Sequence, residues 1–151
     1  MAASVAEGEL SSLSDGLSLS SIFMILIGFF TYLACNIITA PYGRYSTDRG
    51  WGFLVPAKLS WFFMESPNLW IPLIVYRYLG TKKCCDGLPN KVLTGMFIMH
   101  YIQRSIIYPV FRLKGTHHQP IPISISLLAY SFCSWNGTNQ ALSLLVVHSY
   151  P

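Results

Sequence analysis

A single carboxylate, Glu65, lies in the middle of a long apolar stretch that runs from Phe53 to Tyr76. Lys58 is the only other charged residue in that stretch. An ionisable side chain is expensive inside a lipid bilayer, so such residues usually face a cavity and serve a function there. The sequence therefore predicts that this segment borders a cavity in which Glu65 acts.

The composition indicates which class of protein can hold such a segment. Of the 151 residues, 52% are hydrophobic and 11% are charged, whereas soluble domains carry roughly 25% charged residues. A surface with so few charges is not mostly aqueous, and we expect an all-α, polytopic helical bundle in the lipid bilayer. The net charge of +4 is dispersed, and its longest basic run, Lys82-Lys83, is typical of a loop beside the membrane rather than of a nucleic-acid site.

Four apolar runs are long enough to cross a hydrocarbon core about 30 Å thick. They cover residues 21–40, 53–76, 92–110 and 123–147. Three prolines, Pro56, Pro67 and Pro72, predict that the second run is kinked or broken. Irregular backbone at membrane depth is tolerated where it lines a cavity, which supports the same interpretation of Glu65.

The segment before the first run is polar. Residues 1–20 are rich in Ser, Ala and Gly and are expected to be a disordered tail, so that residues 21–151 form the transmembrane domain. The tail has no Lys or Arg, whereas Arg44 and Arg49 follow the first run. The positive-inside rule then places the N-terminus outside or in a lumen.

The third run carries a second polar group. Phe97, Tyr101, Arg104 and Tyr108 recur at helical spacing and predict one shared face. If this face meets Glu65, the Tyr101 phenol is placed to donate a hydrogen bond to a carbonyl oxygen, and a desolvated, neutral Glu65 is able to do the same. Other interpretations stay open at this point. In these interpretations Glu65 only pairs with Lys58 or Arg104 or caps a turn, Tyr101 only lies at an interface, and Arg104 only snorkels at the end of the third run.

Other sequence features predict no further site. His117-His118 has no nearby ligand-like residues, so no metal site is expected. The sequon Asn136-Gly137-Thr138 lies inside an apolar run and is interpreted as a chance match. Cys133 is expected to be an inert packing residue.

Several segments together resemble one family. They are Ala40-Pro41-Tyr42-Gly43-Arg44-Tyr45, Arg49-Gly50-Trp51-Gly52, Trp61-Phe62-Phe63-Met64-Glu65-Ser66-Pro67-Asn68-Leu69-Trp70, His100-Tyr101-Ile102-Gln103-Arg104-Ser105-Ile106-Ile107-Tyr108-Pro109 and Ser131-Phe132-Cys133-Ser134-Trp135-Asn136-Gly137. In this order and spacing, over roughly residues 40–141, they resemble the N-terminal half of the steroid 5-alpha-reductases.

The resemblance implies a seven-helix bundle of the endoplasmic reticulum membrane, of which this chain would hold about four helices. It implies NADPH-dependent reduction of the Δ4 double bond of 3-oxo steroids. Glu65 and Tyr101 match the pair that grips the 3-keto oxygen. Trp61 and Phe132 match apolar walls of the steroid pocket, and Arg104 matches a polar position of the third span that is expected to contact substrate.

The chain also departs from the family pattern. Gln103 stands where some relatives have His, which argues against a proton relay there. The family's C-terminal half, with three spans and most NADPH-binding groups, is not in this sequence, so a truncated product that is inactive alone is expected. The alternatives are a non-catalytic isoform that binds sterol or regulates an associated full-length reductase, and a structural four-span protein unrelated to sterols.

Overall fold

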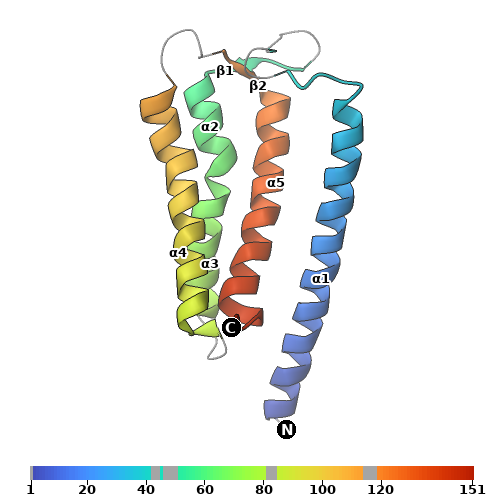
Figure 1. The fold of residues 1–151 in the computed structure, drawn as a ribbon, viewed down its shortest axis with the longest axis vertical. Helices are drawn as coiled ribbons and strands as arrows, with labels where there is room; N and C mark the ends of the chain where they lie inside the picture. Colours follow the sequence, from blue (N-terminus) through green and yellow to red (C-terminus); the bar gives the residue numbers. More distant parts are fainter. Residues whose placement is uncertain (1, 42–44, 46–50, 81–84, 114–118) are drawn as a thin grey trace.

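The computed structural model describes residues 2–41, 45, 51–80, 85–113 and 119–151. Its elements, in chain order, are α1 (Ala2–Cys35), β1 (Leu54–Val55), α2 (Ala57–Glu65), α3 (Pro67–Leu79), α4 (Leu88–Ile102), the π-helical segment η3 (Gln103–Arg112), β2 (Ile121–Pro122), α5 (Ile123–Leu142) and the π-helical segment η5 (Ser143–Val147). They form helical columns that alternate in direction: α1, α2 with α3, α4 with η3, and α5 with η5 (Figure 1). The expected all-α bundle is confirmed.

The first column differs from the prediction at its N-terminal end. α1 begins at Ala2 and continues unbroken through the segment for which the sequence predicts a disordered tail. No proline interrupts it, and serine hydroxyls bond to carbonyls one turn earlier, from Ser18 Oγ to Ser14 O (3.0 Å) and from Ser21 Oγ to Leu17 O (2.9 Å). Serines satisfied in this way are tolerated inside a helix, so the helix extends from the apolar run into the serine-rich segment.

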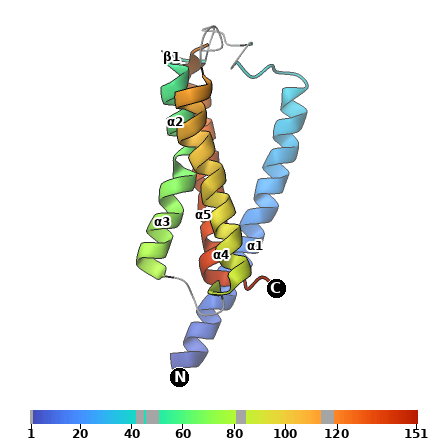
Figure 2. The same cartoon turned by 60° about the vertical axis from the view of Figure 1, so that its left-hand side comes forward.

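The predicted break in the second column is confirmed at Pro67, where α2 ends and α3 begins. Proline has no N–H, so the carbonyl of Phe63, four residues earlier, loses its helical donor. The hydroxyl of Ser66 replaces that donor, with Ser66 Oγ 3.0 Å from Phe63 O. Figure 2 shows that α3 leans away from the line of α2. The break therefore bends the column directly after Glu65 without leaving the carbonyl unpaired.

Two short strands join the N-terminal ends of α2 and α5. β1 and β2 pair antiparallel, with Val55 opposite Ile121. The Ile123 amide donates to Phe53 O (2.9 Å), which extends the pairing to the first residue of α5. Gly52 has φ +87, and a Cβ there would lie 2.9 Å from Ile123 Cγ2. Both the backbone angle and the close approach favour glycine at this position.

α5 is the helix around which the others pack, with α2 and α3 as its main neighbours. Small residues recur along it at four-residue intervals, and the last three of them are buried: Ala129, Cys133, Gly137 and Ala141. Small residues in such a stripe let helix backbones approach closely, which is how helices associate where lipid removes the hydrophobic driving force.

α1 makes few contacts with the rest of the bundle and diverges from it toward Cys35 (Figure 1). Its segment Glu7–Cys35 is long and apolar enough to cross a membrane by length and composition, and it is the one helix of the described residues that meets this test. Its apolar side chains are exposed, for example Ile25 at 72% and Phe30 at 63%, as suits a lipid-facing helix. The other three predicted spans stay predictions.

The C-terminal segment is held by Asn90, a buried residue in the first turn of α4. Asn90 Nδ2 donates to Leu144 O (2.9 Å) and His148 O (2.8 Å), and its Oδ1 accepts from the Tyr150 amide (3.1 Å). One side chain thus satisfies three backbone groups where the last helical turn ends, a place where carbonyls otherwise lack donors.

Replacing Asn90 with leucine is expected to lower the free energy of unfolding by about 2 kcal/mol. Leu144 O and the Tyr150 amide lose the Asn90 side chain as a partner, and His148 O keeps the weaker bond from Cys85 Sγ (3.3 Å). The Tyr150 amide should also exchange its hydrogen faster, which mass spectrometry after deuterium labelling measures. Asn36→Leu is the control, since Asn36 is exposed directly after α1 and its side chain bonds to a nearby carbonyl, Tyr32 O (2.7 Å). Equal effects of the two substitutions would contradict the role of Asn90.

Candidate functional site

Glu65 is the last residue of α2 and is buried, with 6% of its surface exposed. Its Oε1 accepts a hydrogen bond from Nη2 of Arg104 in η3 at 2.5 Å, which makes an ion pair. The sequence allows two ion-pair partners for Glu65, namely Lys58 and Arg104. The structure selects Arg104, whereas Lys58 lies in the first turns of α2 with an exposed side chain. Pairing compensates the charge of a carboxylate that is largely shielded from water.

Trp61 lies one helical turn before Glu65 on α2, and so on the same face. The guanidinium carbon of Arg104 is 5.5 Å from the centroid of the Trp61 ring, a cation–π distance. The Trp61 ring also meets the ring of Tyr108 edge to face, with centroids 5.2 Å apart. Arg104 is therefore fixed by a carboxylate and an aromatic face that both come from α2.

Two pockets open beside this group. The first has a volume of about 210 Å³ and is lined by Trp61, Met64, Glu65, Arg104, Ile121, Ile125 and Ala129. The second has a volume of about 270 Å³ and is lined by Trp61, Gln103, Arg104 and Tyr108. Trp61 and Arg104 border both pockets, so they form the wall between them.

Tyr101 lies on α4, and its hydroxyl accepts a hydrogen bond from Asn136 Nδ2 of α5 (3.1 Å). Tyr101 is not among the residues that line the two pockets. It is nevertheless connected to Glu65 through α5, because Cys133, one turn before Asn136, has its Sγ 3.9 Å from Glu65 Oε2. One turn of a helix rises about 5.4 Å, so Glu65 and Tyr101 contact the same short stretch of α5.

Phe132 does not join the group. Its side chain is 45% exposed on α5, and neither pocket includes it among its lining residues. The structure thus brings Trp61, Glu65 and Arg104 into contact. The catalytic and substrate-binding roles that the resemblance implies stay predictions for these three residues and for Tyr101 and Phe132.

The sequence interpretation missed Asn136 and Asn68. It took Asn136 as part of a chance sequon, yet Asn136 Nδ2 donates both to Tyr101 and to Asn68 Oδ1 of α3 (2.9 Å). The available signal was an amide side chain in an apolar run, since a buried polar group needs a partner. Cys133, expected to be inert, is buried against the carboxylate of Glu65.

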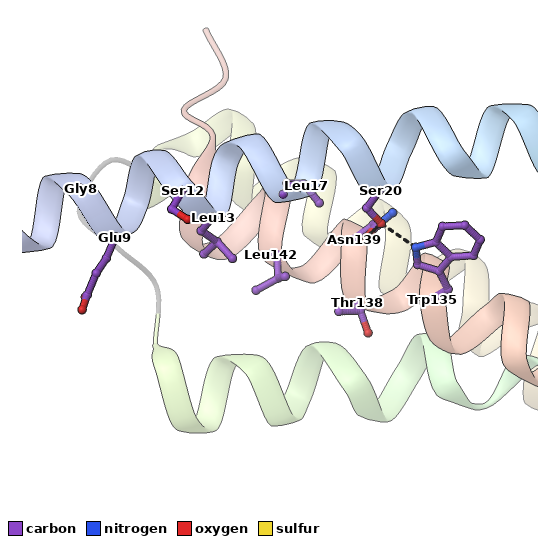
Figure 3. Close-up of a pocket in the computed structure, with 11 residues that line it drawn as sticks. Gly8, Glu9, Ser12, Leu13, Leu17, Ser20, Trp135, Thr138, Asn139 and Leu142 are labelled. Atoms are coloured by element: carbon purple, nitrogen blue, oxygen red, sulfur yellow. Dashed lines mark hydrogen bonds between the residues drawn. The ribbon is translucent and has the colours of Figure 1, made fainter.

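A larger groove of about 720 Å³ lies between the N-terminal half of α1 and the C-terminal half of α5 (Figure 3). It is lined by Gly8, Glu9, Ser12, Leu13, Gly16, Leu17, Ser20, Trp135, Thr138, Asn139 and Leu142. Trp135 Nε1 donates to Ser20 Oγ (2.6 Å), which donates to Asn139 Oδ1 (2.9 Å). These bonds tie α1 to α5, and the groove contains none of the five predicted site residues.

Some sequence predictions lie outside the described residues. They concern His117-His118, the basic run Lys82-Lys83, and Arg44 and Arg49, on which the membrane orientation depends. Within the part of the chain that the structure describes, no group of three or more His, Cys, Asp or Glu side chains is placed to hold a metal ion.

The chain is similar to several curated proteins, although no protein-family profile matches it. It is 35% identical to the 3-oxo-5-alpha-steroid 4-dehydrogenase 1 of Bos taurus over 116 residues, which are 76% of this chain and 44% of the relative. The corresponding enzyme of Rattus norvegicus is 36% identical over 132 residues, 84% of this chain and 48% of the relative.

The plant protein named steroid 5-alpha-reductase DET2, from Solanum lycopersicum, is 35% identical over 120 residues, 79% of this chain and 45% of the relative. The chain therefore spans about half the length of the curated relatives it matches. These similarities confirm, over the matched region, the resemblance to the steroid 5-alpha-reductases that the sequence motifs predict. Together with the long apolar helix α1, they support a membrane protein.

Proposed function

We propose that this chain, a relative of the steroid 5-alpha-reductases over about four fifths of its length, binds the 3-keto end of a 3-oxo-Δ4 steroid whose Δ4 double bond is reduced. The observation that carries the proposal is the convergence of Trp61, Glu65 and Arg104 on one pocket. A planar apolar ligand with one polar end suits a pocket that is mostly apolar and has a few placed polar groups.

Reduction of an enone explains why polar groups are needed at that end. As hydride reaches the carbon skeleton, negative charge builds on the carbonyl oxygen, and preorganised donors stabilise the transition state. Tyr101 supplies a phenol O–H. Arg104 supplies further N–H groups, because a guanidinium has five and Glu65 is bonded to Nη2 alone. Trp61 supplies an apolar wall.

The ion pair changes how Glu65 takes part. The sequence suggests a neutral acid that donates to the ketone, but a carboxylate paired with Arg104 is an acceptor only. The geometry favours an arrangement in which an ionised Glu65 orients Arg104. In the proposal Arg104 then donates to the ketone oxygen, with Tyr101 as the second donor that the resemblance implies. Donation by Glu65 itself requires that the carboxylate take up a proton as Arg104 turns away.

The described residues form one end of a steroid site. Small-molecule pockets usually have volumes of about 300–1,000 Å³, and the pocket at Glu65 has about 210 Å³. The remaining wall of the steroid site is not among these residues, in keeping with a chain that spans about half the length of its relatives.

The resemblance implies NADPH as the hydride donor, but the three pockets described above do not fit the phosphates of this cofactor. Its phosphates need cations or exposed helix N-termini. Arg104 is the only Lys or Arg that lines any of the three pockets, and its guanidinium is held by Glu65. The proposal for this chain therefore concerns the ketone end of the reaction, and the endoplasmic reticulum and a multi-pass topology are proposed from the family alone.

Steroid binding by the purified chain in lipid nanodiscs tests the ketone site. Testosterone, a 3-oxo-Δ4 steroid, should bind about tenfold more weakly to Tyr101→Phe and to Arg104→Leu, because each loses a donor to a buried oxygen. Tyr78→Phe is the matched control, since Tyr78 is 80% exposed on α3. If a steroid with a 3-hydroxyl in place of the ketone binds as tightly as testosterone, the proposed site is wrong.

Reduction itself is measured in microsomes that contain the chain, NADPH and testosterone. Loss of any 5α-reduced product in Glu65→Gln microsomes would support a direct role of the carboxylate. The absence of product from the unsubstituted chain, together with specific steroid binding, would favour a sterol-binding or regulatory chain over a complete reductase.

A further inference from the structure

We propose that Asn136, supported by Asn68, fixes the hydroxyl of Tyr101 as a hydrogen-bond donor toward the ligand carbonyl. Asn136 and Asn68 would then be positioning residues, which act on the ligand through Tyr101. This inference rests on the proposed function, because it assigns a direction to the Tyr101 hydrogen bond at the ketone.

The geometry of the Asn136 amide sets that direction. Its Nδ2 lies 2.9 Å from Asn68 Oδ1 and 3.1 Å from the Tyr101 hydroxyl oxygen. An amide nitrogen carries two hydrogens and accepts none. Both hydrogens are therefore used, and the Tyr101 oxygen is an acceptor in this bond. The phenol hydrogen must point away from Asn136, and the proposed function places the ligand carbonyl on that side.

Asn68 anchors the amide. It is fully buried, at 0% exposure, and it follows Pro67 at the start of α3. A Cβ on Gly137 would lie 3.2 Å from Asn68 Oδ1 and 3.3 Å from Asn68 Cα, so α5 and α3 are almost in backbone contact at this point. The close approach holds Asn136 against Asn68 and leaves its second hydrogen for Tyr101.

The hydrogen of the Tyr101 hydroxyl has no acceptor among the described residues. Among the described residues, the bond from Asn136 is the one hydrogen bond that this hydroxyl makes. Hydrogen bonds in a chain polarise one another where the local dielectric is low. As a ligand carbonyl gains negative charge, donation from Asn136 therefore strengthens donation from Tyr101.

UV resonance Raman spectroscopy tests the direction without a steroid, because the tyrosine ring doublet reports whether the phenol oxygen donates or accepts. The chain has nine tyrosines, so the signal of Tyr101 is taken as the difference between the unsubstituted chain and Tyr101→Phe. We expect a phenol that accepts, and the addition of testosterone should add donation. A phenol that donates before steroid is added would mean that both amides are turned, and would overturn the inference.

Binding measurements test the positioning role. Asn136→Leu should weaken testosterone binding about threefold to tenfold, the effect of one hydrogen bond. In the Tyr101→Phe background the same change should weaken binding by less than about twofold. Equal losses in both backgrounds would show a structural role only. Ser131→Ala is the control, since Ser131 is exposed on α5 and its hydroxyl bonds to Leu127 O of the same helix (2.9 Å).

A second variant keeps the test valid if Asn136→Leu does not fold. Asn136→Asp has nearly the same size, but its carboxylate has no N–H and only accepts, so it turns the Tyr101 hydrogen toward itself. It should weaken testosterone binding at least as much as Tyr101→Phe, and unchanged binding would overturn the inference. If the unsubstituted chain binds no steroid, the proposed function fails, while the Raman difference spectrum still decides how Tyr101 is oriented.

Discussion

Arg104→Met is expected to lower the free energy of unfolding by about 3 kcal/mol, more than Glu65→Gln, which is expected to lower it by about 1 kcal/mol. The difference follows from exposure. The side chain of Glu65 is 8% exposed and that of Arg104 is 40% exposed. Loss of Arg104 leaves a buried carboxylate without a partner, whereas loss of Glu65 leaves a guanidinium that can turn toward solvent or headgroups.

Titration with a denaturing detergent, followed by circular dichroism, measures these free energies. Lys91→Met is the control, because it breaks the exposed pair of Lys91 with Asp86, at 60% and 64% exposure, and such pairs contribute at most about 1 kcal/mol. The double substitution of Arg104 and Glu65 should be less destabilising than Arg104→Met alone, since it removes both charges. A double variant as unstable as the sum of the single variants would contradict the pairing.

The sequence predicts the helical columns well where proline or an apolar run defines them. The break at Pro67 and the fourth column, from Ile123 to Val147, agree with the structure. The N-terminal part of α1 was not predicted, because its small polar composition is typical of disorder while its serines bond within a helix. The π-helical winding of η3, which contains Pro109, has no signature in hydrophobic spacing.

The site was predictable from the sequence only where its residues lie in one helix. Trp61 and Glu65 are one turn apart in one helix, so their shared face follows from spacing alone. The choice of Arg104 as partner depends on how η3 lies against α2, which spacing within one helix does not fix. The contact of Asn136 with Tyr101 and Asn68 joins three helices, and it depends on the depth at which α5 sits between them.

That depth is set at Gly137, and Gly137→Leu is expected to lower the free energy of unfolding by about 3 kcal/mol, the upper end for an overpacked core. A side chain there must displace the backbone of α3, since a Cβ alone would lie 3.3 Å from Pro67 O. The matched control is Gly95→Leu on α4, where the added Cβ would meet no atom within 4 Å apart from its own stretch of helix.

Gly95→Leu should be neutral or slightly stabilising, because leucine favours a helix more than glycine does, by up to about 1 kcal/mol. The same detergent titration compares the two variants. Gly137→Leu should also break the bond between Asn136 and Asn68, so the Raman signal of Tyr101 should lose its acceptor character together with the stability. If Gly137→Leu is as stable as Gly95→Leu, then α5 does not rest on α3 as described, and the packing of Gly137 against Asn68 does not hold.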